Sequence, residues 1–141
     1  MIYNKNICAV FLAIVIPLLL TDCCIKKRAK IPQQKSYSDI TPQELIQKIE
    51  RGGKFVLLDV RSEEEYRSGH IKDAILIPHT EIESRYKELG CKCREIVVYC
   101  RSGRRSVTAS EALVRLGFGR VKNLIGGIIA WEKAGSEVIK D

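Results

Sequence analysis

Two short segments of the chain are apolar at every position, and they limit the folds that this sequence can adopt. They are residues 55–58, with the sequence FVLL, and residues 96–99, with the sequence IVVY. A strand with one exposed face alternates apolar and polar residues, whereas a strand buried on both faces of a parallel sheet is apolar throughout. The two segments therefore predict strands of a parallel sheet that is covered on both sides.

Helical patterns alternate with these strands. Thr41, Pro42 and Glu44 are typical of a helix start, because they supply an N-cap, a proline in the first turn and a capping-box partner. Shorter strands are expected at residues 74–77 and 121–124, and further helices at residues 63–67, 82–89, 106–116 and 128–133. This alternation predicts an α/β fold with a doubly wound parallel sheet and helices on both faces.

The net charge of +7 is concentrated before the predicted fold. Residues 1–35 contain six basic residues and one acidic residue, so they carry +5, and only +2 remains for residues 36–141. Nucleic-acid binding needs a concentrated positive face, which the predicted domain does not offer. We therefore expect no nucleic-acid partner.

An apolar run occupies residues 7–20, preceded by Lys5, and predicts a signal peptide or membrane anchor over residues 1–24. A basic linker is expected over residues 25–36 and the folded domain over residues 37–141. We expect export to the periplasm or anchoring to the inner membrane, with membrane association through residues 7–20. The basic residues after the run favour the alternative, an uncleaved anchor with its domain in the cytoplasm.

Cys100 directly follows the second apolar run and begins a short loop that leads into a predicted helix. In open α/β sheets, ligands bind where strands end and loops lead into helices. The N–H groups and dipole at a helix start favour an anion, so a cysteine there should lose its proton easily. We expect Cys100 to be the catalytic nucleophile. The residues expected to bind substrate around it are Arg101, Ser102, Gly103, Arg104, Arg105 and Ser106.

Several motifs resemble, in order and spacing, those of the rhodanese-like domain family. They are LDVR at residues 58–61, EY at 65–66, GHI at 69–71, CRSGRRS at 100–106, GF at 117–118 and GG at 126–127 with Trp131. The resemblance implies a five-stranded sheet and a thiosulfate sulfurtransferase that carries sulfane sulfur as a persulfide on Cys100. The implied partners are a small sulfur donor and a thiol or cyanide acceptor. No cofactor and no metal are implied.

Asp59, Arg61 and His70 belong to the first of these motifs. In the family, the positions of Asp59 and Arg61 mainly hold neighbouring loops together by ion pairing, and the position of His70 lies in a turn. We therefore expect structural support from these three residues rather than acid–base catalysis. This expectation agrees with the general rule that buried charges are paired.

Two other functions have to be considered. A phosphatase or arsenate reductase of related fold needs an arginine one position beyond Arg105, where this chain has Ser106. A non-catalytic rhodanese-like binding or regulatory module usually lacks the cysteine, which this chain retains. Both features favour the sulfurtransferase.

Cys91 and Cys93 form a C-x-C pair ahead of the strand that leads to Cys100, and no motif of the family explains them. They are either incidental or functional. If they are functional, one of them accepts sulfur from Cys100, or the two form a disulfide in an oxidising compartment.

Overall fold

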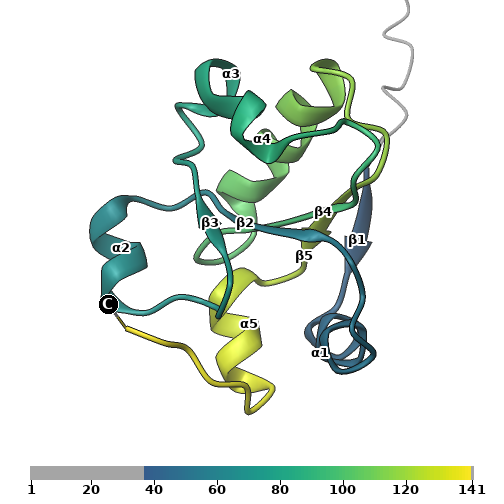
Figure 1. Ribbon diagram of the computed structural model, residues 1–141. Coiled ribbons are helices and arrows are strands. Elements are labelled where there is room, and N and C mark those ends of the chain that lie inside the picture. Colours follow the sequence, from purple (N-terminus) through teal and green to yellow (C-terminus); the bar gives the residue numbers. More distant parts are fainter. Residues whose placement is uncertain (1–36, 141) are drawn as a thin grey trace, which may run out of the picture. The chain divides into compact units, whose positions relative to one another are not determined.

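Five parallel strands form the centre of the structure, a computed structural model in which residues 37–140 are described. The strands pair in the order β1-β5-β4-β2-β3 (Figure 1). Their bounds are Ser38–Ile40 for β1, Val56–Asp59 for β2, Ile75–Leu76 for β3, Ile96–Tyr99 for β4 and Val121–Leu124 for β5. The doubly wound parallel sheet of five strands is thus confirmed.

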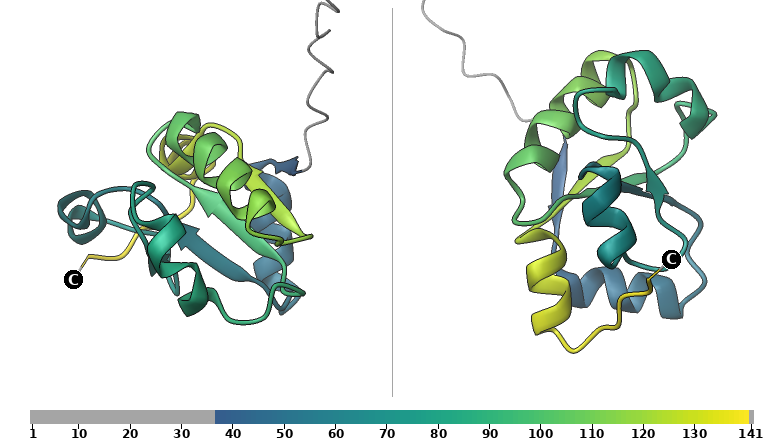
Figure 2. Two further views of the ribbon diagram at one scale, coloured as in Figure 1. Left: turned by 90° about the horizontal axis from the view of Figure 1, so that it is seen from above. Right: turned by 90° about the vertical axis from the view of Figure 1, so that its left-hand side faces the viewer.

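Helices cover both faces of this sheet. They are α1 (Pro42–Glu50), α2 (Glu63–Ser68), α3 (Ile82–Arg85), the 3-10 helix η1 (Tyr86–Leu89), α4 (Arg104–Arg115) and α5 (Gly127–Lys133). One apolar cluster joins α3, η1 and α4 to one face, and a second joins α1 and α5 to the other. In Figure 1 these layers lie above and below the sheet, and Figure 2 (right) shows α2 between them.

β4 shows why a strand in this position has no polar face. Ile96 and Val98 belong to the apolar cluster beneath α4, whereas Val97 and Tyr99 belong to the cluster on the side of α1 and α5. All four residues are fully buried. A polar side chain at any of these positions would need a partner in the core, so the strand is apolar throughout.

The predicted start of α1 is confirmed. The Thr41 side-chain oxygen accepts a hydrogen bond from the Glu44 backbone N–H (3.2 Å), and Glu44 Oε2 accepts one from the Thr41 backbone N–H (2.8 Å). Two N–H groups that have no partner within the helix are satisfied in this way.

Other elements differ from the prediction. The segment expected as one helix over residues 82–89 divides into α3 and η1, and the strand expected over residues 74–77 shortens to Ile75–Leu76. β1 was not predicted. Only one of its three residues, Ile40, is buried, so its sequence shows no alternation of apolar and polar residues. It exists through its pairing with β5.

The expected signal or anchor segment and the basic linker lie outside the described residues. Within residues 37–140, no helix has both the length and the apolar character needed to cross a membrane.

Replacing Thr41 with alanine is expected to lower the free energy of unfolding by about 1 kcal/mol, because a first-turn N–H of α1 loses its partner. Thr108→Ala, at an exposed position inside α4, serves as the control and should change stability little. Urea denaturation of both variants measures the difference. Equal losses in the two variants would contradict the assigned cap.

Candidate functional site

Cys100 lies at the carboxyl end of β4, where the sheet changes its direction of winding. From β2 the chain continues through α2 to β3, and from β4 it continues through α4 to β5, on opposite sides of the β2–β4 pair. The loops after β2 and β4 therefore diverge, which is the geometry of ligand crevices in open α/β sheets. The Cys100 side chain lies at this end of the β2–β4 pair, with only 1% of the residue exposed.

The loop after Cys100 curls around the sulfur. The backbone N–H of Gly103 donates to Cys100 Sγ over 3.1 Å. Gly103 has a φ of 102°, a backbone conformation that favours glycine, and is the N-cap of α4. Because this helix begins directly after the loop, its positive end faces the sulfur.

The outward side of the same loop is fixed by α5. The N–H groups of Ile128 and Ile129 donate to the carbonyl oxygens of Cys100 (2.9 Å) and Arg101 (3.2 Å). Gly127 makes this approach possible, since a Cβ at that position would lie 2.2 Å from the Cys100 carbonyl oxygen. With its carbonyls bound on the outside, the loop has N–H groups available on the inside for an anion.

These donors determine the ionisation of Cys100. Burial on its own raises the pKa of the thiol, because it disfavours the charged form. Hydrogen bonds from the Ser106 hydroxyl and from the backbone of Ser106, Ser102 and Gly103 act in the other direction. The hydrogen bonds prevail, and the pKa of Cys100 lies below its ordinary value. The arrangement therefore favours a thiolate.

Ser106 is buried in the first turn of α4, and its hydroxyl lies 2.9 Å from the Gly103 carbonyl oxygen and 2.7 Å from Asn123 Oδ1. The amide of Asn123 in turn donates to Asp39 Oδ1 over 3.1 Å. A hydroxyl has one proton, so Ser106 can donate to only one acceptor at a time, either Cys100 Sγ or one of these two oxygens. These contacts place the Ser106 side chain between the loop and β5.

Arg105, in the first turn of α4, contacts α2. Its Nη1 and Nη2 atoms lie 2.6 and 2.7 Å from the two carboxylate oxygens of Glu65. The hydrogen bond from Arg105 is the main reason why the pKa of Glu65 falls to about 2. The pKa of Arg105 is raised, chiefly by Glu65 and additionally by the neighbouring Cys100. The ion pair therefore holds a guanidinium beside the sulfur.

Three side chains of the loop are exposed to solvent. They belong to Arg101, Ser102 and Arg104, whereas Gly103 and Arg105 are half-buried. The structure thus separates the three arginines into one that is fixed beside Cys100 and two on the outer surface of the loop.

Asp59 and Arg61 form a buried ion pair at the carboxyl end of β2. The Arg61 Nε atom lies 3.0 Å from both carboxylate oxygens of Asp59, and Nη2 lies 2.6 Å from one of them. Nη2 also donates to the Gly69 carbonyl oxygen over 2.8 Å. Arg61 therefore connects the end of β2 to the turn after α2.

His70 is placed in that turn. Its backbone forms a two-bond bridge with Ile139, and its ring stacks on Tyr66 at a centroid distance of 3.7 Å. Its Nδ1 lies 3.1 Å from the Tyr66 carbonyl oxygen. These contacts are structural, and none of them reaches Cys100.

Three residues that support the Cys100 loop, Glu65, Asn123 and Gly127, were not predicted from the sequence as site residues. Glu65 could have been found as a capping-box residue, because Ser62 precedes it by three positions and the structure contains that box. Asn123 and Gly127 act on the loop only after β5 and α5 have packed beside β4. Asn123 carries no local pattern that marks such a contact, whereas Gly127 belongs to the GG motif at residues 126–127, which could have drawn attention to it.

Cys91 and Cys93 are joined by a disulfide and lie before β4, whereas Cys100 lies after it. A strand of four residues is roughly 13 Å long, so the two sites are at opposite ends of β4. A direct transfer of sulfur from Cys100 to either cysteine of the same folded chain would have to span at least this separation. The alternative, a disulfide, is the arrangement observed.

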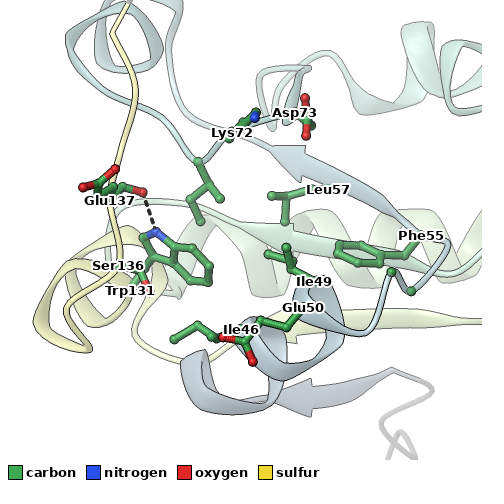
Figure 3. A pocket seen from close by; sticks show the side chains of 13 residues that line it. Ile46, Ile49, Glu50, Phe55, Leu57, Lys72, Asp73, Trp131, Ser136 and Glu137 are labelled. Atoms are coloured by element: carbon green, nitrogen blue, oxygen red, sulfur yellow. Dashed lines mark hydrogen bonds between the residues drawn. The ribbon is translucent and has the colours of Figure 1, made fainter.

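A cavity lies away from the loop. It has a volume of about 590 Å³ and lies between α1, α5 and the sheet, lined by residues that include Ile46, Leu57 and Trp131 (Figure 3). No residue of 100–106 lines it. Within residues 37–140, no group of three or more His, Cys, Asp or Glu side chains is placed to hold a metal ion.

Comparison with known proteins relates the chain to one family. The rhodanese-like domain matches residues 41–134. A sulfurtransferase of Allochromatium vinosum is 39% identical over 102 residues, which are 72% of this chain and 94% of that protein. The HTH-type transcriptional regulator Rv0324 of Mycobacterium tuberculosis is 44% identical over 101 residues, 70% of this chain but only 43% of that protein.

Among solved structures, a rhodanese-related protein from Thermoplasma volcanium superposes with a TM-score of 0.67 at 31% identity. The match covers 74% of this chain and all of that chain. The likeness therefore extends over the whole sheet and its helices.

Glu65→Gln is expected to make stability less sensitive to acid. A carboxyl whose pKa is about 2 in the folded chain and 4.5 ordinarily stabilises the fold above about pH 4.5. That stabilisation is lost as the pH falls toward 2. Urea denaturation should show the variant clearly less stable than the wild type near neutral pH, with a smaller difference at about pH 3.

The control for this measurement is Glu64→Gln, at an exposed position of the same helix. Its difference from the wild type should stay small at both pH values. A Glu65→Gln difference that does not depend on pH would refute the role of the Glu65–Arg105 pair.

Proposed function

The chain belongs to the rhodanese-like domain family, and from this premise we propose that it is a thiosulfate sulfurtransferase that carries sulfane sulfur on Cys100. The observation that carries the proposal is the buried Cys100 sulfur, enclosed by backbone N–H groups and with a lowered pKa. A thiolate in such a site is a nucleophile without the help of a separate base.

The proposed reaction has two steps. The Cys100 thiolate attacks the outer sulfur of thiosulfate, the sulfur–sulfur bond of the donor breaks, and sulfite leaves with the electron pair. Cys100 then carries a persulfide, whose terminal sulfur is attacked by cyanide or a thiolate. Thiocyanate or a new persulfide leaves, and the Cys100 thiolate is restored.

The loop has the features that this sequence of steps requires. Its inward N–H groups and the start of α4 stabilise negative charge on the sulfur before and after transfer. Arg105, held by Glu65, adds a positive charge where an anionic donor would approach. Neither step needs a cofactor or a metal ion.

A phosphatase of related fold is a weaker candidate. Such chemistry needs an arginine at the position of Ser106, and this residue is buried with its hydroxyl against Asn123. An arginine side chain could not be accommodated there without displacing β5. The loop is therefore better suited to one sulfur atom than to a tetrahedral phosphate.

The second candidate is a regulatory module, favoured by the likeness to the regulator Rv0324. In that case the domain would bind a partner or sense a sulfur species without turnover. The lowered pKa of Cys100 supports the enzyme over a module that only binds a partner, since such a module needs no thiolate. A sulfur-sensing module would also need a thiolate, so turnover is what separates it from the enzyme.

Cys100→Ser is expected to reduce thiosulfate:cyanide sulfurtransferase activity to background while the fold is retained. A hydroxyl is a far weaker nucleophile and cannot form a persulfide. Mass spectrometry of the wild type after incubation with thiosulfate should show one added sulfur on Cys100, and the variant should show none. A persulfide that forms but does not turn over would favour the regulatory module.

Phosphatase chemistry is tested on the same proteins with an aryl phosphate. Turnover of this substrate by the wild type, lost in Cys100→Ser and without any persulfide, would overturn the sulfurtransferase proposal.

Arg105→Ala is expected to raise the KM for thiosulfate by about tenfold or more, because a charge-assisted hydrogen bond contributes about 1.5–3 kcal/mol. Arg104→Ala, at an exposed position next to it, is the matched control and should change KM little. Steady-state kinetics with thiosulfate and cyanide measure both effects. A larger change in the Arg104 variant would show that the donor approaches from the outer surface of the loop.

A further inference from the structure

Two further sulfur atoms, those of Cys91 and Cys93, lie on the surface away from the Cys100 loop. Cys91, Lys92, Cys93 and Arg94 form an exposed turn between η1 and β4, closed by a hydrogen bond from the Arg94 N–H to the Cys91 carbonyl oxygen (3.0 Å). The Cα atoms of Cys91 and Cys93 are 5.3 Å apart, and the two residues form a disulfide. The turn thus brings two accessible thiols within bonding reach.

This bridge contributes little to the stability of the fold. A disulfide stabilises mainly by restricting the unfolded chain, and the effect is smallest for short loops. Here the bridge spans a single residue, inside a turn that already has its own backbone hydrogen bond. A structural purpose therefore does not account for the pair.

The surroundings favour reactivity at Cys91. Its Sγ accepts a hydrogen bond from the backbone N–H of Cys93 over 3.2 Å. The exposed Lys92 and Arg94 also give this turn two positive charges, which lie one and three positions after Cys91 in the sequence. An N–H donor and neighbouring cations stabilise a thiolate, which is the form that attacks disulfides.

We propose that Cys91 and Cys93 form a second reaction centre, which exchanges electrons with small thiols and disulfides independently of Cys100. In the oxidising direction, the Cys91 thiolate attacks a small disulfide and releases one thiolate, which leaves a mixed disulfide on Cys91. The Cys93 thiolate then attacks the Cys91 sulfur and releases the second thiolate. One small disulfide is reduced to two thiols, and the protein dithiol becomes the disulfide.

The two centres are chemically distinct. The Cys100 reaction moves a sulfur atom through a persulfide at the carboxyl end of β4, whereas the pair at the other end of β4 moves two electrons and keeps its own sulfur atoms. They share no described hydrogen bond. The reaction of each centre can therefore be measured in a variant that lacks the cysteines of the other.

The test is equilibration of the full chain in glutathione buffers of varied ratio of reduced to oxidised form, followed by trapping with iodoacetamide. Cleavage after glutamate yields a peptide of residues 89–95, which contains both cysteines and no other. Mass spectrometry should find this peptide with two labels in reducing buffers and lighter by two hydrogens, without label, in oxidising ones. Cys100→Ser should give the same curve.

Two single variants show whether the pair acts as a unit. Cys91→Ser and Cys93→Ser should each accumulate a mixed disulfide with glutathione on the remaining cysteine, because the resolving thiol is absent. The double variant should keep the thiosulfate:cyanide activity of the wild type. The proposal is overturned if the wild-type peptide keeps two labels in fully oxidised glutathione, or if it takes up glutathione on both cysteines instead of forming the internal bond.

Discussion

The site depends on one backbone contact, in which the first N–H groups of α5 bind the carbonyl oxygens of Cys100 and Arg101. A peptide unit has its N–H and C=O on opposite sides, so fixing the carbonyls outward leaves N–H groups on the side of the sulfur. The contact requires the absence of a side chain at Gly127, where the two backbones meet. The charge state of Cys100 is thus set by packing between two segments that are distant in the sequence.

The sheet topology brings the elements around Cys100 together. β4 and β5 are neighbours, so the helix that follows β5 begins beside the loop that follows β4. β2 lies on the other side of β4, and Glu65 of α2 reaches across to Arg105. The buried Asp59–Arg61 pair secures the base of α2 through Gly69. Elements from both halves of the chain therefore support one sulfur atom.

The sequence predicted best what rests on local patterns. β4, the Cys100 loop and the α1 cap follow from short apolar runs, from a strand-to-helix junction and from the spacing of Thr41 and Glu44. Contacts between residues that are far apart along the chain were not predicted. Glu65 and Arg105 are separated by 40 positions and Ser106 and Asn123 by 17, and no periodicity indicates such pairs. β1 was missed for the same reason, since only β5 makes it a strand.

The hydrogen bonds that lower the pKa of Cys100 exist only in the folded chain. In a nascent or unfolded chain, the same cysteine lacks the enclosing N–H groups and the start of α4, so it remains an ordinary thiol. Because α5 must be in place to orient the loop, the nucleophile arises only after almost the whole domain has been synthesised and packed. The reactive form of Cys100 is therefore a product of the completed fold.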